Sequence, residues 1–178
     1  MHTSGPFMAT WRPRVKTLLF SLAGMLALAV AATPVRASED PGLAAAKALF
    51  LRYQSLERSF DPALADLYAD DAVIRVRRVY VNGVVRYLKV PAELYKPALR
   101  QSAATAREQG DFNEYSGVSY RREGERVRID AQRYSVWQHY RSPWSLWVAP
   151  DAGGRWLIRE EHLEQHLPVP AHGESETQ

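Results

Sequence analysis

The sequence predicts an α+β domain in which three helices pack on a mostly antiparallel sheet. Three observations support this prediction. The first is two Asp-Pro pairs, Asp40-Pro41 and Asp61-Pro62, because each supplies a helix N-cap followed by a proline at the first helical position. The second is Asn82-Gly83, a two-residue hairpin turn between runs rich in β-branched residues. The third is the stretch from residue 112 to residue 164, which consists of strand-like segments separated by short turns.

The spacing of apolar residues supports each helix. After the first Asp-Pro pair, Leu49, Tyr53 and Leu56 recur at the helical period and form one apolar face. A short second helix follows the second pair. A third helix is expected to begin at Pro91 and to end at Gly110, because glycine is a common C-terminal stop.

The strands fall into two groups. Residues 73–81 and 84–90 form a hairpin around the Asn82-Gly83 turn. Four further strands are expected to form a meander, with a break at Arg141-Ser142-Pro143. These four strands span residues 112–122, 125–139, 144–149 and 155–164.

Residues 1–37 have the three parts of a secretory signal. Three basic residues precede an uncharged stretch from Thr17 to Val35, and Val35-Arg36-Ala37 favours cleavage before Ser38. The alternative is an uncleaved membrane anchor, since the uncharged stretch could just span a bilayer. We therefore expect a periplasmic or secreted protein that contacts a membrane only if this segment is retained. Residues 40–167 would form the domain, and residues 168–178 a disordered tail.

Charge and cysteine content narrow the possible functions. The whole chain has 23 basic and 20 acidic residues, and residues 1–37 contain four of the basic and none of the acidic ones. Cleavage would therefore leave 19 basic against 20 acidic side chains, and this balance does not predict a nucleic-acid partner. The absence of cysteine excludes disulfides and thiol chemistry. No phosphate-binding glycine loop or dinucleotide fingerprint is present, so we expect no cofactor.

This order of elements resembles that of the nuclear transport factor 2-like superfamily, which includes SnoaL-like polyketide cyclases and ketosteroid isomerase-like proteins. The segment Phe60–Val73 looks like the family's second helix running into its first strand, and Trp156–Glu161 looks like its last strand. The resemblance covers about residues 40–166. It implies a curved, cone-like sheet of the cystatin-like roll type, with a cavity between this sheet and the helices. Proteins of this fold include enzymes, binding domains and dimerisation modules, so the fold alone does not identify the function.

Strand parity indicates which residues of 125–139 face that cavity. Val127, Ile129 and Ala131 share one face, which must be the buried one. The same face is expected to continue through Arg133 and beyond as it becomes polar and aromatic. The predicted ligand-binding residues are Arg133, Trp137, His139 and Trp144. The alternative is that a bulge reverses the face, or that the last residues reach the solvent at the edge of the sheet.

One pair of residues is a candidate for catalysis. His139 is predicted on a strand among aromatic residues, and a histidine there could transfer protons near neutral pH. Glu160, on the last strand, could approach Arg133 or His139, although a purely structural ion pair is the alternative. His162 and His166 are four residues apart but match no zinc motif, so we expect no metal.

We therefore expect an exported, non-catalytic domain that binds a small apolar or amphipathic molecule in an apolar, cone-shaped pocket. One alternative is a cofactor-free isomerase, dehydratase or cyclase. The other is a protein-interaction or dimerisation module of the cell envelope. We also expect a homodimer that pairs through the polar outer face of the sheet.

Overall fold

A computed structural model describes residues 40–167, so the predicted signal at 1–37 and the predicted tail at 168–178 lie outside the described residues. The chain divides into two units, Met1–Arg36 and Ala37–Gln178, and the described residues belong to the second. In the described part, no helix is both long and apolar enough to cross a membrane. In chain order, the elements are α1 (Pro41–Arg58), the 3-10 helix η1 (Pro62–Leu67), β1 (Tyr68–Tyr80), β2 (Val85–Pro91), α2 (Ala92–Gln109), β3 (Asn113–Glu123), β4 (Arg126–Ser135), β5 (Tyr140–Pro150) and β6 (Trp156–Leu167).

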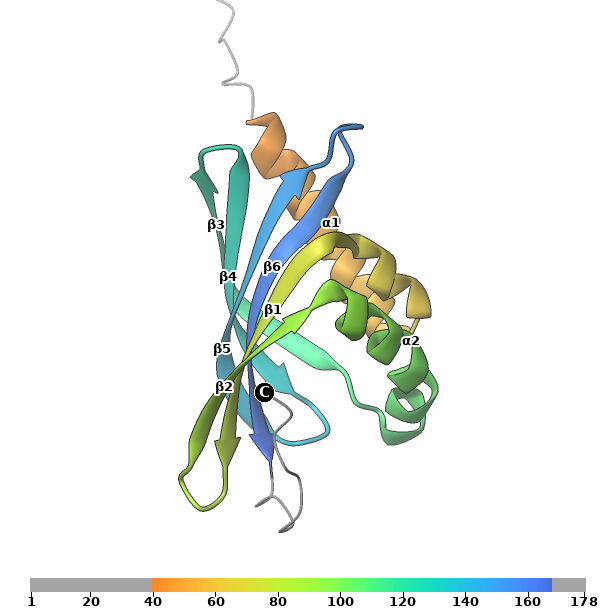
Figure 1. Cartoon of the computed structure of the whole chain (residues 1–178), viewed down its shortest axis with the longest axis vertical. Coiled ribbons are helices and arrows are strands. Elements are labelled where there is room, and N and C mark those ends of the chain that lie inside the picture. The colour runs from red at the N-terminus through yellow and green to blue at the C-terminus, as the bar shows by residue number, and fades with distance from the viewer. Residues whose placement is uncertain (1–39, 168–178) are drawn as a thin grey trace, which may run out of the picture. The chain divides into compact units, whose positions relative to one another are not determined.

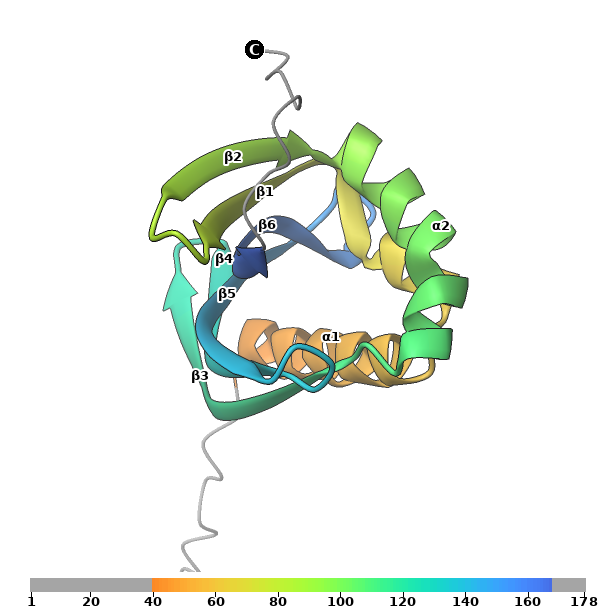
Figure 2. The ribbon, with the colours of Figure 1, turned by 90° about the horizontal axis from the view of Figure 1, so that it is seen from below.

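The six strands form one sheet in the order β2-β1-β6-β5-β4-β3. All neighbours are antiparallel except β1 and β6, which are parallel (Figure 1). The predicted mixed α+β class and the mostly antiparallel sheet are therefore confirmed. The sheet is curved, and α1 and α2 lie across its concave side (Figure 2). Helix α1 packs on β3, β4 and β6, whereas α2 packs on η1, β1 and β2.

An aromatic cluster joins α1 to the concave face of the sheet. The ring of Phe50 lies 5.5 Å from that of Trp144 on β5 and 5.4 Å from that of Tyr115 on β3. Tyr115 and Trp144 lie 4.8 Å apart, and Tyr53 contacts both. Large aromatic side chains bury much apolar area at modest conformational cost, so this cluster anchors the helix to the sheet.

The helix signals are confirmed, with one change of helix type. The carboxylate of Asp40 accepts a hydrogen bond from the backbone N–H of Gly42 at 2.7 Å, and Asp61 caps η1 in the same way through Ala63 at 2.8 Å. The second predicted helix is a six-residue 3-10 helix rather than an α-helix. Gly110 ends α2 in the left-handed conformation, with φ of 64°.

Three of the predicted strand limits are wrong. The first strand begins at Tyr68 rather than at residue 73. The strand expected at 125–139 ends at Ser135, and the next four residues form a turn in which His139 has a positive φ of 57°. The break expected at 141–143 is absent, because β5 runs through Pro143. The ladder between β5 and β6 begins only at Ser145, so Pro143 pairs with β4 alone. A proline, which has no N–H, is tolerated where a strand has a neighbour on one side only.

Strand β6 contains a β-bulge at Arg159. Trp147 pairs with Glu160 and Val148 with Ile158, which leaves Arg159 as an extra residue opposite β5. A bulge of this kind exchanges the two faces of a strand. Ile158 is buried before the bulge, and Glu161 is buried after it. The residue that faces the concave side is therefore Glu161 rather than its neighbour.

The β1–β2 hairpin exposes an apolar edge. Its turn contains the predicted Asn82-Gly83 but is one residue longer than predicted, since the N–H of Tyr80 donates to the carbonyl of Val84 at 2.9 Å and leaves Val81, Asn82 and Gly83 in the loop. Gly83 has a φ of 84°. Strand β2 lies at one edge of the sheet. The exposed large apolar side chains of this hairpin are Val81, Val84, Val85 and Tyr87.

The two faces of α1 make a testable prediction. Leu49 is 6 % exposed in the core, whereas Leu51, two residues later in the same helix, is 66 % exposed. Leu49→Ala should lower the free energy of unfolding by about 2–5 kcal/mol, because it leaves a cavity. Leu51→Ala is the matched control and should change it by less than about 0.5 kcal/mol. Urea denaturation measures both values, and equal losses would contradict this packing of α1.

Candidate functional site

A cavity of about 370 Å³ lies between the helices and the concave face of the sheet. One wall is apolar and comes mostly from the helices. Its large aliphatic residues are Leu56, Leu64, Leu99 and Leu163. The other wall carries charged and polar groups from α1, β3, β4 and β6. The ionisable and hydrogen-bonding residues of this wall that are described below are Glu57, Asn113, Arg133 and Glu161.

Glu161 is the most buried acidic side chain of the site, with 1 % exposure. Its Oε2 accepts a hydrogen bond from the Tyr68 hydroxyl at 2.7 Å. Its Oε1 accepts from the Trp144 indole at 2.8 Å and from the Tyr53 hydroxyl at 3.4 Å. Burial raises the pKa of Glu161, and the hydrogen bond from Tyr68 offsets part of that rise. The carboxyl group is thus held in place by hydrogen bonds from three elements.

Glu57 lies one helical turn after Tyr53 on α1, on the side of the helix that faces the cavity. Its Oε1 accepts hydrogen bonds from the Asn113 amide at 2.7 Å and from the Tyr115 hydroxyl at 3.2 Å. Burial raises the pKa of Glu57 to about 7, although these two hydrogen bonds lower it in part. A carboxyl group that titrates near neutral pH can give or take a proton inside the cavity.

Arg133 on β4 is the cation of the site and is only 8 % exposed. Its Nη2 donates to the Tyr140 hydroxyl at 2.9 Å and to the backbone carbonyl of Glu164. Its Nε is buried and has no hydrogen-bond partner among residues 40–167. Guanidinium groups remain charged at all ordinary pH values, so Arg133 places one fixed positive charge in this wall.

The structure brings together only some of the predicted site residues. Arg133 lines the cavity, whereas Trp144 is buried and donates to Glu161 but does not itself line the cavity. Trp137 is 45 % exposed, and both Trp137 and His139 lie in the turn after β4 and do not line the cavity. The expected continuation of the inner face to these two residues is wrong, because the strand ends at Ser135.

Glu160 lies on the outer face of the sheet. Its Oε1 is 2.6 Å from Arg75 Nε and 2.6 Å from His162 Nε2. The expected approach to Arg133 or His139 is therefore wrong, and Glu160 instead forms its ion pairs on the outer face rather than with an inward partner. His166 makes an equivalent contact with Glu164, also at 2.6 Å.

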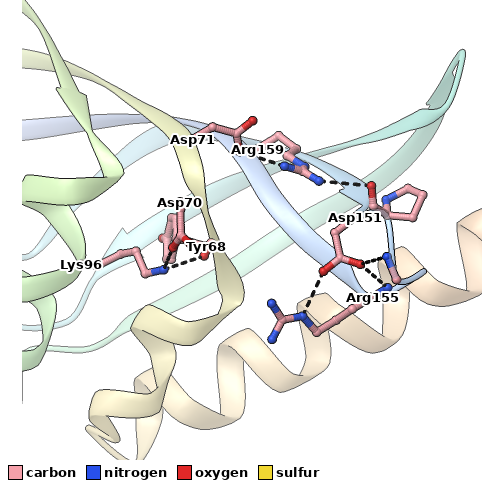
Figure 3. A network of polar contacts seen from close by, with 9 residues as sticks. Tyr68, Asp70, Asp71, Lys96, Asp151, Arg155 and Arg159 are labelled. Atoms are coloured by element: carbon pink, nitrogen blue, oxygen red, sulfur yellow. Dashed lines mark hydrogen bonds and ion pairs between the residues drawn. The ribbon is translucent and has the colours of Figure 1, made fainter.

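Ion pairs hold the bulge of β6 and the adjoining part of β1 (Figure 3). Lys96 on α2 donates to Asp70 at 2.5 Å and to the backbone carbonyl of Tyr68 at 3.2 Å. Arg159, the extra residue of the bulge, donates to Asp71 at 2.8 Å and to the carbonyl of Pro150 at 3.2 Å. These contacts link α2, β1, β5 and β6 next to the positions from which Tyr68 and Glu161 reach inward.

Sequence reasoning missed the two carboxyl groups of the site for different reasons. Glu57 follows Tyr53 by four residues and so shares the apolar face of α1, which is a signal that the sequence contains. Glu161 carries no such signal, because a single bulge at Arg159 decides which of two adjacent glutamates turns inward.

The raised pKa of Glu57 predicts a pH-dependent stability. Between its usual pKa of 4.5 and about 7, the folded protein keeps a proton that the unfolded chain has released. The free energy of unfolding should therefore fall as pH rises through this window, by up to about 3 kcal/mol from this group. Glu57→Gln should remove the contribution of Glu57 to the dependence of the unfolding free energy on pH. The contributions of Asp111 and Glu161, whose pKa values are also raised, should remain. Denaturation at about pH 5 and pH 8 measures the difference, and identical slopes in the two proteins would refute it.

Comparison with known proteins identifies the fold. No family model matches the sequence, and no curated protein matches it either. Among solved structures, one similar to this chain is an NTF2-like protein of unknown function from Pseudomonas putida KT2440, with 13% identity over 67% of this chain and 83% of the other, at a TM-score of 0.53. A chain in the yeast deubiquitinase Ubp3 and Bre5 cofactor complex is also similar, with 17% identity over 66% of this chain and 90% of the other, at a TM-score of 0.51. The chain therefore has the nuclear transport factor 2-like fold.

Proposed function

We propose that this protein binds a small amphipathic molecule in the cavity between its helices and the concave face of its sheet. The observation that carries this proposal is the two-sided lining of the cavity. Leucines from α1, η1 and α2 face charged groups from α1, β4 and β6 across a space of about 370 Å³. Ligand sites typically combine an apolar wall with a few placed polar groups. The charged wall favours an amphipathic ligand over a wholly apolar one.

Filling the cavity should abolish binding. Ala103 on α2 lines the cavity, whereas the adjacent Ala104 is exposed and does not. N-phenyl-1-naphthylamine is a small neutral probe that fluoresces in apolar surroundings. The unmodified protein should bind it at one saturable site, and Ala103→Trp should weaken binding at least tenfold, because the indole occupies the space of the probe.

Ala104→Trp is the matched control, since it adds the same side chain to the same helix outside the cavity. Its affinity for the probe should stay within about twofold of the unmodified protein. Equal affinities in the two tryptophan variants, or the absence of saturable binding in the unmodified protein, would refute the proposed function.

A second candidate is a cofactor-free enzyme that transfers a proton. The observation that favours it is Glu57, a cavity carboxyl group with a pKa of about 7. A group with such a pKa can act as base or acid at neutral pH. Under this proposal, the substrate would have an acidic C–H bond that lies against Glu57.

A generic carbon acid tests this second candidate. In 5-nitrobenzisoxazole, a base removes the ring C–H proton while the N–O bond breaks, which yields a coloured cyanophenolate. The rate should rise with the ionisation of Glu57, with a midpoint near pH 7, and should fall at least a hundredfold in Glu57→Gln. A rate that is the same in the variant would count against Glu57 as a base.

The proposal also includes export and pairing. The basic, apolar and small-residue parts of residues 1–37 support cleavage before Ser38, which intact-mass measurement of the exported protein checks. The outer face of β4 carries Arg128, Asp130 and Gln132, and such a polar face can pair with a second copy. Light scattering should give the mass of a homodimer, and a monomer mass would contradict this part of the proposal.

A further inference from the structure

Arg133 is a buried cation without an acidic partner. Its side chain contacts a hydroxyl group and a backbone carbonyl, and no described carboxylate lies within ion-pair distance of it. Buried charges in proteins are almost always paired, because removal of an unpaired ion from water is costly. A guanidinium group that lines a cavity without a partner points to a ligand of opposite charge.

The unused donor of Arg133 has an unpaired neighbour. In the described part of the chain, two buried side-chain atoms lack a hydrogen-bond partner, Arg133 Nε and Ser142 Oγ. These two residues are directly opposite each other in the β4–β5 ladder, and both are buried. Unpaired buried polar groups are rare and call for a bound group or an ordered water. The two residues are therefore neighbours on β4 and β5, and of the two only Arg133 lines the cavity.

Neither glutamate of the site makes a hydrogen bond to Arg133. The oxygens of Glu161 are occupied by Tyr53, Tyr68 and Trp144. Oε1 of Glu57 is occupied by groups from β3. Burial raises the pKa of both carboxyl groups, and Arg133 lowers both in part. The guanidinium group on β4 therefore has no described carboxylate in direct contact with it.

We propose that the ligand is an amphipathic carboxylate whose carboxylate group is bound by Arg133 and whose apolar part lies against the leucines of α1, η1 and α2. This inference rests on the proposed function, since it names the class of molecule that the same cavity takes. A carboxylate oxygen that accepts the Nε–H would supply the partner that this donor lacks, and charge-assisted hydrogen bonds of this kind are strong.

Three probes of equal chain length test this assignment. Octanoate, 1-octanol and octylammonium share one apolar tail and differ in the charge of the head group. Calorimetric titration of the unmodified protein should give an affinity for octanoate at least tenfold higher than for octanol, with octylammonium the weakest. The order follows from the charge of Arg133, because a hydrogen bond to a charged group exceeds one to a neutral group.

Two variants of β4 compare the loss of an arginine on the inner face with the loss of an arginine on the outer face. Arg133→Met removes the guanidinium and keeps a long apolar side chain. It should reduce the affinity for octanoate to that for octanol, while the affinity for octanol stays within about twofold. Arg128→Met is the matched control on the outer face of the same strand, where Arg128 pairs with Asp130 at 2.7 Å, and it should keep the full preference for octanoate.

A measurement on the unmodified protein tests the inference even if Arg133→Met does not fold. The carboxyl carbon of bound [1-¹³C]octanoate can be titrated by NMR, separately from Glu57, Asp111 and Glu161, which face the same space. Beside a guanidinium group, the pKa of the bound octanoate should fall below that of free octanoate, whereas an apolar or acidic site would raise it. A raised pKa would overturn the inference.

The remaining outcomes are equally decisive. If octanol binds as tightly as octanoate, Arg133 Nε contacts only water, and the inference fails while small-molecule binding stands. If octylammonium binds most tightly, the glutamates set the charge of the site, and the inference fails in the same way. If no probe binds, both the proposed function and the inference fail.

Discussion

The burial of the Glu161 carboxyl group is the constraint on which the inside of this fold depends. A carboxyl group with 1 % exposure is tolerated only where donors surround it, and the donors here come from α1, β1 and β5. Tyr53 extends from the helix, Tyr68 from the first strand and Trp144 from a strand on the other side of β6. The spacing between helix and sheet must therefore match the reach of three hydrogen bonds. Loss of any one donor leaves part of a buried polar group unsatisfied, and that cost exceeds the value of the bond itself.

The same constraint explains the polar contacts around the bulge. Glu161 turns inward only because Arg159 adds one residue to β6 opposite β5. Arg159 is held by Asp71 and by a carbonyl at the end of β5, and Lys96 fixes the backbone of Tyr68 (Figure 3). Exposed ion pairs of this kind contribute little to stability one by one. Their effect here is geometric, since they maintain the register that brings the carboxyl group and its tyrosine donor face to face.

The sequence predicted the fold better than it predicted the site, and the reason is physical. Caps and turns such as Asp40-Pro41, Asn82-Gly83 and Gly110 act within a few residues, so their signals are complete in the sequence. Arg133 lines the cavity because the alternation of β4 is unbroken up to Ser135, whereas Trp144 is buried next to Glu161 without lining the cavity. Trp137 and His139 were misplaced because a strand end depends on the partners of the strand. Glu160 was chosen in place of Glu161 because a bulge of one residue reverses every position after it.

The exposed edge at β2 has a consequence for how this protein behaves in solution. An edge strand presents unpaired backbone groups, and neighbouring valines and a tyrosine make this one a template for aggregation. Arg86 and Lys89 interrupt the apolar residues of this strand. Positive side chains on an edge disfavour pairing with another chain, because like charges would be brought together. Colloidal solubility at high concentration therefore depends on these two cations, in a part of the sheet that is separate from the cavity.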